Sequence, residues 1–164
     1  DRVILKGFVN QDQLLHELSK CDLLYCPYFF SNDDILKMVS SLSFPSKVVT
    51  YLALDVPTIY HGPSYSGPYK FLKSNDCAIL LTDNEPEKIK NKLRDITKID
   101  KSKMLKNVIE TFNKNFEYEV VKANFMKALN LKYDGKKKLK ILILRLYFIY
   151  LLPSFSKMPF CRPM

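Results

Sequence analysis

Short apolar runs alternate with amphipathic stretches along the first half of the chain. The apolar runs, bounded by Gly, Pro or polar residues, predict four strands at residues 3–9, 22–27, 57–60 and 78–81. The stretches between them carry apolar residues at helical spacing and predict helices at residues 11–21, 43–54 and 69–74. Such a β-α order predicts an α/β, Rossmann-like domain, with parallel strands joined by right-handed crossovers and helices on both faces of the sheet.

Local signals mark where several helices begin. Ser43 is a predicted N-cap, with Pro45 in the first turn of the helix at residues 43–54. Pro86 opens another helix, and two more are predicted at residues 103–112 and 118–129. The last of these places Val121, Phe125 and Leu129 on one stripe. These helices are expected to close a domain over residues 1–131.

The charge of the chain lies mainly at its C-terminal end. The net charge of the 164 residues is +9, but residues 1–131 hold 18 basic against 16 acidic side chains, and residues 132–164 hold 8 against 1. A nucleic-acid-binding domain carries its basic residues as a patch on the folded part. The composition, 47% hydrophobic and 26% charged, is that of a folded domain, and no nucleic-acid partner is expected.

Residues 132–164 form a basic and apolar tail. Residues 136–138 are three lysines, and residues 139–152 are apolar apart from Lys140 and Arg145. This stretch is shorter than the ~20 residues that span a bilayer. It fits a peripheral contact with an anionic membrane surface, a packed terminal helix, or residues translated past a reading-frame error.

The sequence offers no metal site. The four cysteines lack the paired spacing of zinc ligands and are expected to be buried thiols: Cys21, Cys26, Cys77 and Cys161. His16 is expected to be a surface or packing residue. His61 either donates a hydrogen bond to a phosphate or has a structural role. Because the chain begins at Asp1 just before an apolar run, it is expected to be a fragment.

Two segments are predicted at the carboxyl edge of the sheet, where open α/β domains bind ligands. Residues 43–47 open a helix after the second predicted strand, and residues 61–66 follow the third. Ser46 supplies a hydroxyl and Lys47 a positive charge at a helix start, a combination that can hold a diphosphate. The alternative is that Ser43 and Pro45 only start the helix and that Lys47 is solvated.

The residues around this predicted clamp resemble a known family. The segment S-F-P-S-K-V-V-T-Y-L-A at residues 43–53, followed by V-P-T-I and then H-G-P, resembles the donor-binding segment of GT-B glycosyltransferases of the capsule and exopolysaccharide type. Those enzymes commonly read S-x-P-S-K-x-x-E-Y-L-A, then G-x-P-V-I, then a G-P loop. The resemblance covers about residues 2–130 and implies part of the C-terminal, donor-binding domain.

The resemblance implies transfer of a sugar from a nucleotide-diphosphate sugar to an acceptor hydroxyl, on a polysaccharide or a lipid-linked sugar, in surface polysaccharide synthesis. It implies no cofactor and no metal, and a cytoplasmic location, with peripheral contact at the inner face of the plasma membrane if the tail binds lipid. Catalytic residues are not assigned, since the family's acceptor-binding domain is expected outside these residues. The donor-binding residues that it implies are Ser43, Ser46, Lys47, Thr50, Gly62 and Ser64.

The sequence departs from the family at several positions. Thr50 stands where the family has a glutamate that grips the ribose, Leu42 where relatives carry an earlier glutamate, and Asp55 where they carry glycine. A threonine cannot accept two hydroxyl hydrogen bonds as a carboxylate does. A non-catalytic nucleotide-sugar-binding module and a nucleotide-sugar epimerase of the same fold therefore remain alternatives. A membrane or nucleic-acid binder driven by the tail is a third.

Overall fold

The computed structural model describes residues 3–96, 99 and 101–129. The chain divides into two compact units, Asp1–Lys122 and Ala123–Met164. The second unit is described only over residues 123–129, which include the end of helix α7 (Tyr118–Ala128). The predicted apolar tail lies outside the described residues, so the fold reported below is that of the first unit.

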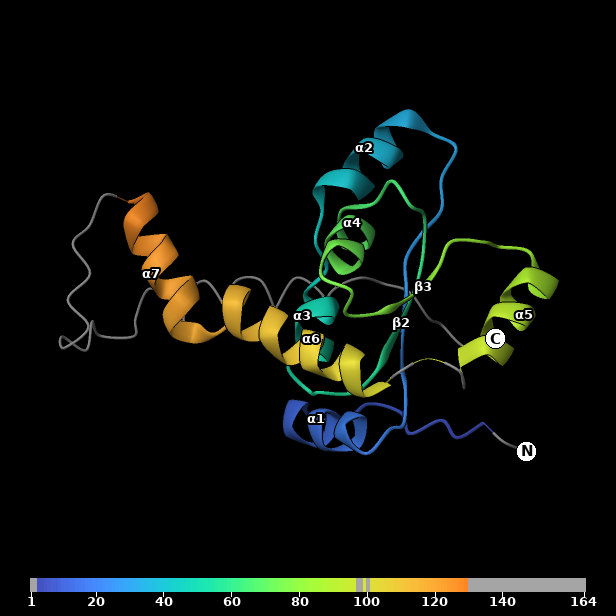
Figure 1. Ribbon diagram of the computed structural model, residues 1–164, viewed down its shortest axis with the longest axis horizontal. Helices are drawn as coiled ribbons and strands as arrows, with labels where there is room; N and C mark the ends of the chain where they lie inside the picture. The colour runs from blue at the N-terminus through green and yellow to red at the C-terminus, as the bar shows by residue number, and fades with distance from the viewer. Residues whose placement is uncertain (1–2, 97–98, 100, 130–164) are drawn as a thin grey trace. The chain divides into compact units, whose positions relative to one another are not determined.

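Three parallel strands form the sheet of the first unit (Figure 1). They are β1 (Leu24–Pro27), β2 (Thr58–His61) and β3 (Ile79–Leu81), in the order β1-β2-β3. Leu24 pairs with Thr58, and Ile59 pairs with Ile79. The described part of the chain is therefore a mixed α/β fold with a small, open parallel sheet, as the alternation of apolar runs and helical stretches predicts.

Helices connect and flank these strands, and side chains cap several of them. Asn10 accepts a hydrogen bond from the backbone of Gln13 at 2.9 Å, and Asp33 accepts one from Leu36 at 2.9 Å. The helices of the first unit are α1 (Gln11–Ser19), α2 (Asp34–Leu42), α3 (Ser46–Leu52), α4 (Gly67–Ser74), α5 (Pro86–Asp95) and α6 (Lys101–Asn115).

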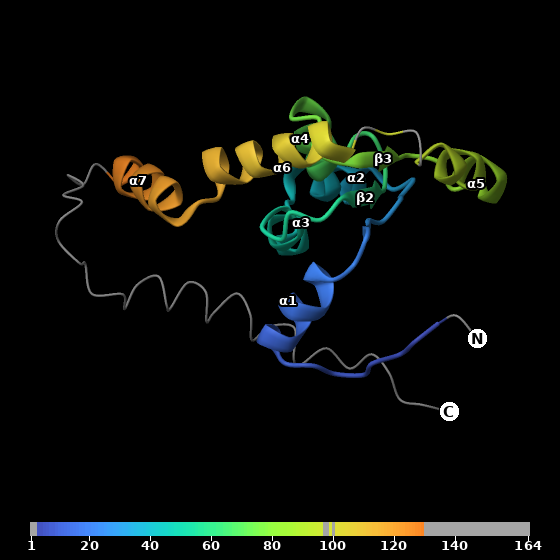
Figure 2. The same ribbon diagram turned by 60° about the horizontal axis from the view of Figure 1, so that its bottom comes forward.

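The sheet is buried on both faces at β2 and largely so at β3, which explains the nearly continuous apolar character of these two strands, whereas Tyr25 and Pro27 of the edge strand β1 are exposed. One face packs against α3, α4 and α6, and the other against residues near α5 and the start of α6. The first cluster contains Cys26, Val48, Leu52, Tyr60, Leu72, Cys77 and Val108, and the second contains Ile59, Ile79, Leu81, Ile96 and Met104. Helices α3 and α6 lie side by side over the first face (Figure 2).

The prediction of a strand at residues 3–9 is wrong. These residues form no strand, and Leu5 and Phe8 are 91% and 100% exposed. Gly7 takes a φ of +67°, a left-handed conformation that interrupts a regular strand. An apolar run becomes a strand only where a neighbouring edge pairs with it, and no edge of the described sheet does so.

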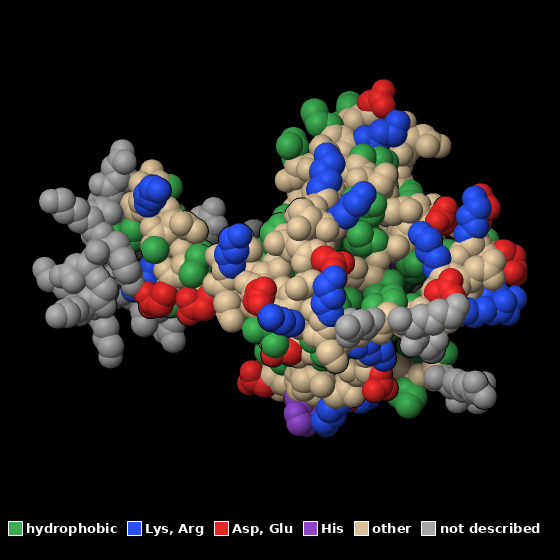
Figure 3. Space-filling view, viewed as in Figure 1, with side chains coloured by type: hydrophobic (Ala, Val, Ile, Leu, Met, Phe, Trp, Pro, Cys, Tyr) green, Lys and Arg blue, Asp and Glu red, His purple; other side chains and the backbone are tan. Residues whose placement is uncertain are grey.

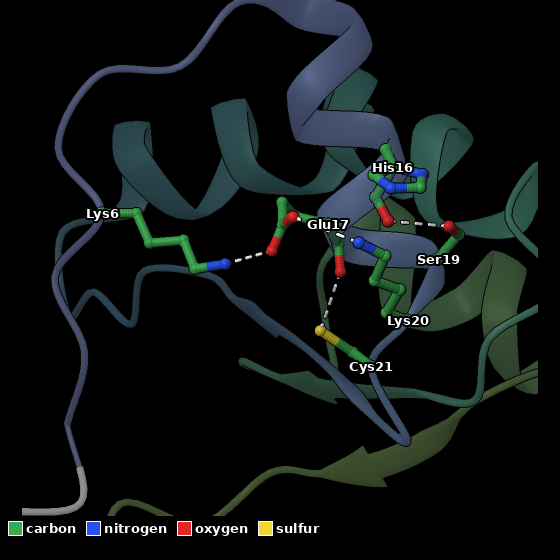
Figure 4. A network of polar contacts seen from close by, with 6 residues as sticks. All are labelled: Lys6, His16, Glu17, Ser19, Lys20 and Cys21. Atoms are coloured by element: carbon green, nitrogen blue, oxygen red, sulfur yellow. Dashed lines mark hydrogen bonds and ion pairs between the residues drawn. The ribbon is translucent and has the colours of Figure 1, made fainter.

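Polar contacts instead hold this segment to α1 (Figure 4). Lys6 forms an ion pair with Glu17, which lies near Lys20 as well. The hydrogen bond from Lys6, followed by the charge of Lys20, lowers the pKa of the Glu17 carboxyl. Because all three side chains are exposed to solvent, this network contributes little to stability.

Helix α2 lies before the predicted diphosphate clamp, in a stretch where the sequence predicted no helix. Helix α2 ends at Leu42, and Ser43 is its C-cap, so the predicted role of Ser43 as an N-cap is wrong. The next helix, α3, begins only at Ser46, with Pro45 at its N-cap position and no side chain capping it. Residues 43–45 connect the two short helices, and the hydroxyl of Ser43 bonds to Tyr28 and does not cap α3.

Two further predictions are corrected by the exposure of side chains. Val121, the residue of the predicted stripe that lies in the first unit, is 41% exposed and is not part of that unit's core; Phe125 and Leu129 lie in the second unit and are 43% and 52% exposed. Helical spacing predicts an amphipathic helix but not what covers it. Cys26 and Cys77 are buried as expected, whereas Cys21, at the end of α1, is exposed. Cys161 lies outside the described residues.

Candidate functional site

Tyr28 connects the carboxyl ends of β1 and β2 to the segment that precedes α3. Its backbone N–H donates to the carbonyl of His61 at 2.7 Å, and its hydroxyl hydrogen-bonds to that of Ser43. Ser43 is thereby held at the carboxyl edge of the sheet, where the sequence predicts it. Its hydroxyl is already bonded to Tyr28, so in this arrangement it orients the segment.

Ser46 and Lys47 begin α3, and both side chains are exposed. The first N–H groups of a helix have no partner within the helix, and Pro45 offers no side-chain cap. Burial raises the pKa of the Cys26 thiol, and the positive charge of Lys47 opposes this, so Lys47 acts electrostatically on β1. With only seven residues in α3, the helix dipole is small, and Lys47 supplies most of the positive potential.

Thr50 is half-buried on the same helix. Its hydroxyl donates to the carbonyl of Ser46 at 3.3 Å, one turn earlier. A hydroxyl bonded back to its own helix has less capacity to hold a ligand. Thr50 therefore has no free donor for a ribose, and its oxygen can only accept a hydrogen bond from a ribose hydroxyl.

Gly62 is packed into the ends of the strands. Its N–H donates to the carbonyl of Leu81 at 3.0 Å, and any Cβ would overlap the Tyr60 hydroxyl and lie 2.7 Å from the Cβ of Tyr28. Only glycine fits here, because the side chains of Tyr60 and Tyr28 already fill the space. Ser64, two residues later, is exposed. Of the predicted loop residues, Ser64 is thus accessible to a ligand, whereas Gly62 is buried.

His61 is held between two neighbours at the end of β2. Its Nε2 lies 2.8 Å from the carbonyl oxygen of Asp83, and its Nδ1 lies 2.6 Å from the hydroxyl of Tyr25. A carbonyl only accepts, so Nε2 carries the proton, and in the neutral ring Nδ1 accepts from Tyr25. Both ring nitrogens are occupied. His61 therefore joins the three strand ends and has no spare N–H for a phosphate. His16 is exposed on α1, as expected of a surface residue.

The structure thus brings Ser43, Gly62 and His61 together through Tyr28, and places Ser46 and Lys47 at the start of the next helix. Neither Tyr25 nor Tyr28 was predicted from the sequence to belong to this site. Tyr25 is exposed between buried Leu24 and Cys26, but residues 23–27 are a continuous apolar run, so the sequence gives no signal that would have singled it out.

A cavity of about 510 Å³ lies elsewhere, along β3. None of the six predicted donor-binding residues lines it. Its lining comes from β3, α5 and α6, and consists of Asp76, Ala78, Ile79, Leu80, Leu81, Lys92, Asp95, Ile99, Lys103 and Met104.

Over residues 3–96, 99 and 101–129, no group of three or more His, Cys, Asp or Glu side chains is arranged to hold a metal ion. Within the same residues, no helix combines the length and apolar character needed to cross a membrane.

Comparison with known proteins gives no family for the chain. No family model matches it, and no curated protein matches it significantly.

Proposed function

We propose that this chain is part of the donor-binding domain of a glycosyltransferase and holds a nucleotide-diphosphate sugar at the edge where β1 and β2 end. One observation carries the proposal. The S-F-P-S-K segment, which resembles the donor-binding segment of GT-B glycosyltransferases, lies at the carboxyl edge of a parallel sheet with Ser46 and Lys47 exposed.

The chemistry of a diphosphate fits these groups. Lys47 offers a positive charge, Ser46 a hydroxyl, and the start of α3 offers uncapped backbone N–H groups. In sugar transfer, negative charge develops on the diphosphate as the bond to the sugar breaks. Donors and a cation fixed beside it stabilise that leaving group without a metal ion. The proposal assigns binding to this chain and assigns none of its residues to proton transfer.

The acceptor is proposed from the resemblance alone. It is a hydroxyl of a polysaccharide or a lipid-linked sugar, and the transfer takes place at the cytoplasmic side of the membrane. Contact of the tail with that membrane belongs to the same proposal, because the basic and apolar residues from Lys132 onward suit an anionic surface.

A second candidate is a non-catalytic module that binds nucleotide sugars. It is favoured by the state of two positions where the family carries glutamate. The Thr50 hydroxyl is bonded to the carbonyl of Ser46, and Leu42 is an exposed apolar side chain on α2. Without either carboxylate, the diphosphate is held and the ribose is held weakly. The epimerase alternative has no comparable support.

The test is calorimetric binding of UDP, GDP and a sugar conjugate of each to the full chain. Lys47→Ala is expected to weaken binding by ~1.5–3 kcal/mol, the scale of a charged hydrogen bond, which is at least tenfold in affinity. Lys90→Ala is the matched control, because Lys90 is an exposed lysine on α5. Equal affinities of the wild-type protein and Lys47→Ala would remove Lys47 from the site, and no nucleotide binding by either would refute the proposal.

A second variant tests the second candidate. Thr50→Glu restores the carboxylate of the family. If ribose recognition is what this chain lacks, this variant binds UDP more tightly and inorganic pyrophosphate no more tightly than the wild-type protein. Unchanged UDP binding would count against the hypothesis of a non-catalytic module that holds the ribose weakly.

A further inference from the structure

Helix α2 is oriented with its apolar side outward. Successive residues of a helix are turned by about 100°, so five apolar side chains of α2 fall within one arc of roughly 160°. All five are exposed: Ile35 by 69%, Leu36 by 47%, Met38 by 56%, Val39 by 46% and Leu42 by 80%. We call these five residues the α2 apolar face. Figure 3 shows hydrophobic side chains gathered over this helix at the top of the view.

The inward side of α2 is polar. Ser40 is completely buried, and its hydroxyl has no hydrogen-bond partner among the described residues. Lys37 and Ser41, on the same side, are half-buried. An ordinary surface helix buries its apolar stripe and exposes its polar residues. Helix α2 does the reverse, which indicates that its outward face has a partner.

The orientation of α2 is fixed by its neighbours. The helix begins at the Asp33 cap and packs on α4 (Figure 1). At Gly67, the first residue of α4, a Cβ would lie 2.8 Å from the carbonyl oxygen of Ser43 and 3.0 Å from that of Ser41. Because the backbones touch this closely, α2 cannot roll to bury its apolar face without separating from α4.

We propose that the α2 apolar face is an interface between two copies of this chain, in which the α2 helices pack antiparallel. Four of the five apolar residues are placed symmetrically about a point between Met38 and Val39, and the fifth, Leu36, has Ser41 as its counterpart. A two-fold axis at that point places Ile35 of one copy against Leu42 of the other, and Met38 against Val39. The same patch then serves on both copies, as a two-fold interface requires.

Charge selects the antiparallel arrangement. Asp33 and Asp34 lie together at the start of α2, and Asp34 is almost fully exposed. Parallel helices would bring four carboxylates together, whereas antiparallel helices keep the two pairs at opposite ends. Lys37 pairs with Asp34 at 3.1 Å, but two carboxylates against one lysine leave this end of α2 negative, which disfavours an anionic lipid surface as the occupant.

The size of the face indicates a weak dimer. The exposed fractions of its five residues add up to about three whole aliphatic side chains. This is on the order of 500 Å² per copy, close to the lower limit for a specific interface of about 1,000 Å² in total. Dimers are therefore expected only at high protein concentration.

Sedimentation velocity of the full chain over about 1–300 µM tests the proposal. The expected result is a concentration-dependent shift from monomer to dimer. Met38→Glu places a charge beside the two-fold axis and is expected to give only monomer, with an unchanged far-ultraviolet circular dichroism spectrum. Leu14→Glu, at an exposed leucine of α1, is the matched control and keeps the dimer. A wild-type monomer throughout, or a dimer that survives Met38→Glu, overturns the proposal.

Disulfide crosslinking tests the register, in a background with Cys21→Ser and Cys161→Ser. Val39→Cys lies beside the axis and is expected to crosslink with itself. Ile35→Cys is expected to crosslink with a Leu42→Cys protein and poorly with itself, because its own symmetry mate is about 10 Å away along the helix. Equal crosslinking at all positions would overturn the antiparallel register. Binding of the wild-type protein to phosphatidylglycerol vesicles that Met38→Glu abolishes would assign the face to lipid instead.

Discussion

Two buried serines make a matched pair for testing hydrogen-bond satisfaction in this fold. Ser40 and Ser66 are both 0% exposed. The Ser66 hydroxyl lies 2.6 Å from that of Tyr60 and accepts from the N–H of Tyr69 at 3.2 Å as the cap of α4. The Ser40 hydroxyl has no partner in the part of the chain that the structure describes. Replacing each with alanine removes the same atom and is expected to change stability in opposite directions.

For Ser66→Ala, two effects add. Loss of the cap costs about 1 kcal/mol, and the buried hydroxyl of Tyr60 loses its partner, which costs ~1–3 kcal/mol. The expected loss is about 2–4 kcal/mol. For Ser40→Ala, the desolvation cost of an unpaired hydroxyl disappears, and alanine is a better helix former than serine. The expected gain is about 1 kcal/mol.

Urea unfolding measures both effects. Because the chain has no tryptophan, the transition is followed by far-ultraviolet circular dichroism at a protein concentration where the chain is monomeric. A Ser40→Ala protein less stable than the wild type would refute the assignment of an unpaired Ser40. A Ser66→Ala protein with the wild-type midpoint would refute the role of the Tyr60–Ser66 contact.

Three more outcomes follow from the core. Gly62→Ala is expected to lose ~1–3 kcal/mol of stability, since its Cβ overlaps Tyr60, and an unchanged urea midpoint would contradict this. With Cys161→Ser, Cys21 is expected to react at once with a thiol reagent, whereas Cys26 and Cys77 react only on unfolding; three fast thiols would count against the described core. Burial raises the pKa of Tyr60 from 10.0 to about 12 and that of Cys77 from 9.0 to about 11. Because the folded state favours the neutral forms, the contribution of both groups to the free energy of unfolding is complete below about pH 9. Urea midpoints should fall as the pH rises from about 9 toward 12, and a constant midpoint over that range would exclude the effect.

The strands were the most predictable part of the fold. Short apolar runs predicted all three: the runs at β1 and β2 end at proline or glycine, and the run at β3 ends at the polar residues Thr82 and Asp83. Residues 3–9 carry the same signal and form no strand, since pairing depends on a neighbour that local sequence does not specify. Helix α2 was missed although Asp33 is a good N-cap, because the polar residues before it read as a loop.

The candidate site was predictable in position and not in detail. The sequence places Ser43 and Lys47 after β1, where the structure has them. It could not show that the Ser43 hydroxyl is bonded to Tyr28, or that His61 is held by Tyr25 and Asp83. Those partners are separated from each other by 15 to 36 positions in the chain, so only the folded sheet brings them together.

The strand register also bears on the order in which the fold forms. Pairing of Ile59 with Ile79 closes a shorter stretch of chain than pairing of Leu24 with Thr58. Closure entropy grows with the logarithm of loop length, so the difference favours the β2-α4-β3 crossover by only about 0.5 kcal/mol. Its helix, however, is capped by Ser66, whose hydroxyl also bonds to Tyr60 of β2. We therefore expect this crossover to be the folding nucleus, with amides of β2 and α4 protected before those of β1 in pulse-labelled hydrogen exchange, and earlier protection of β1 would exclude it.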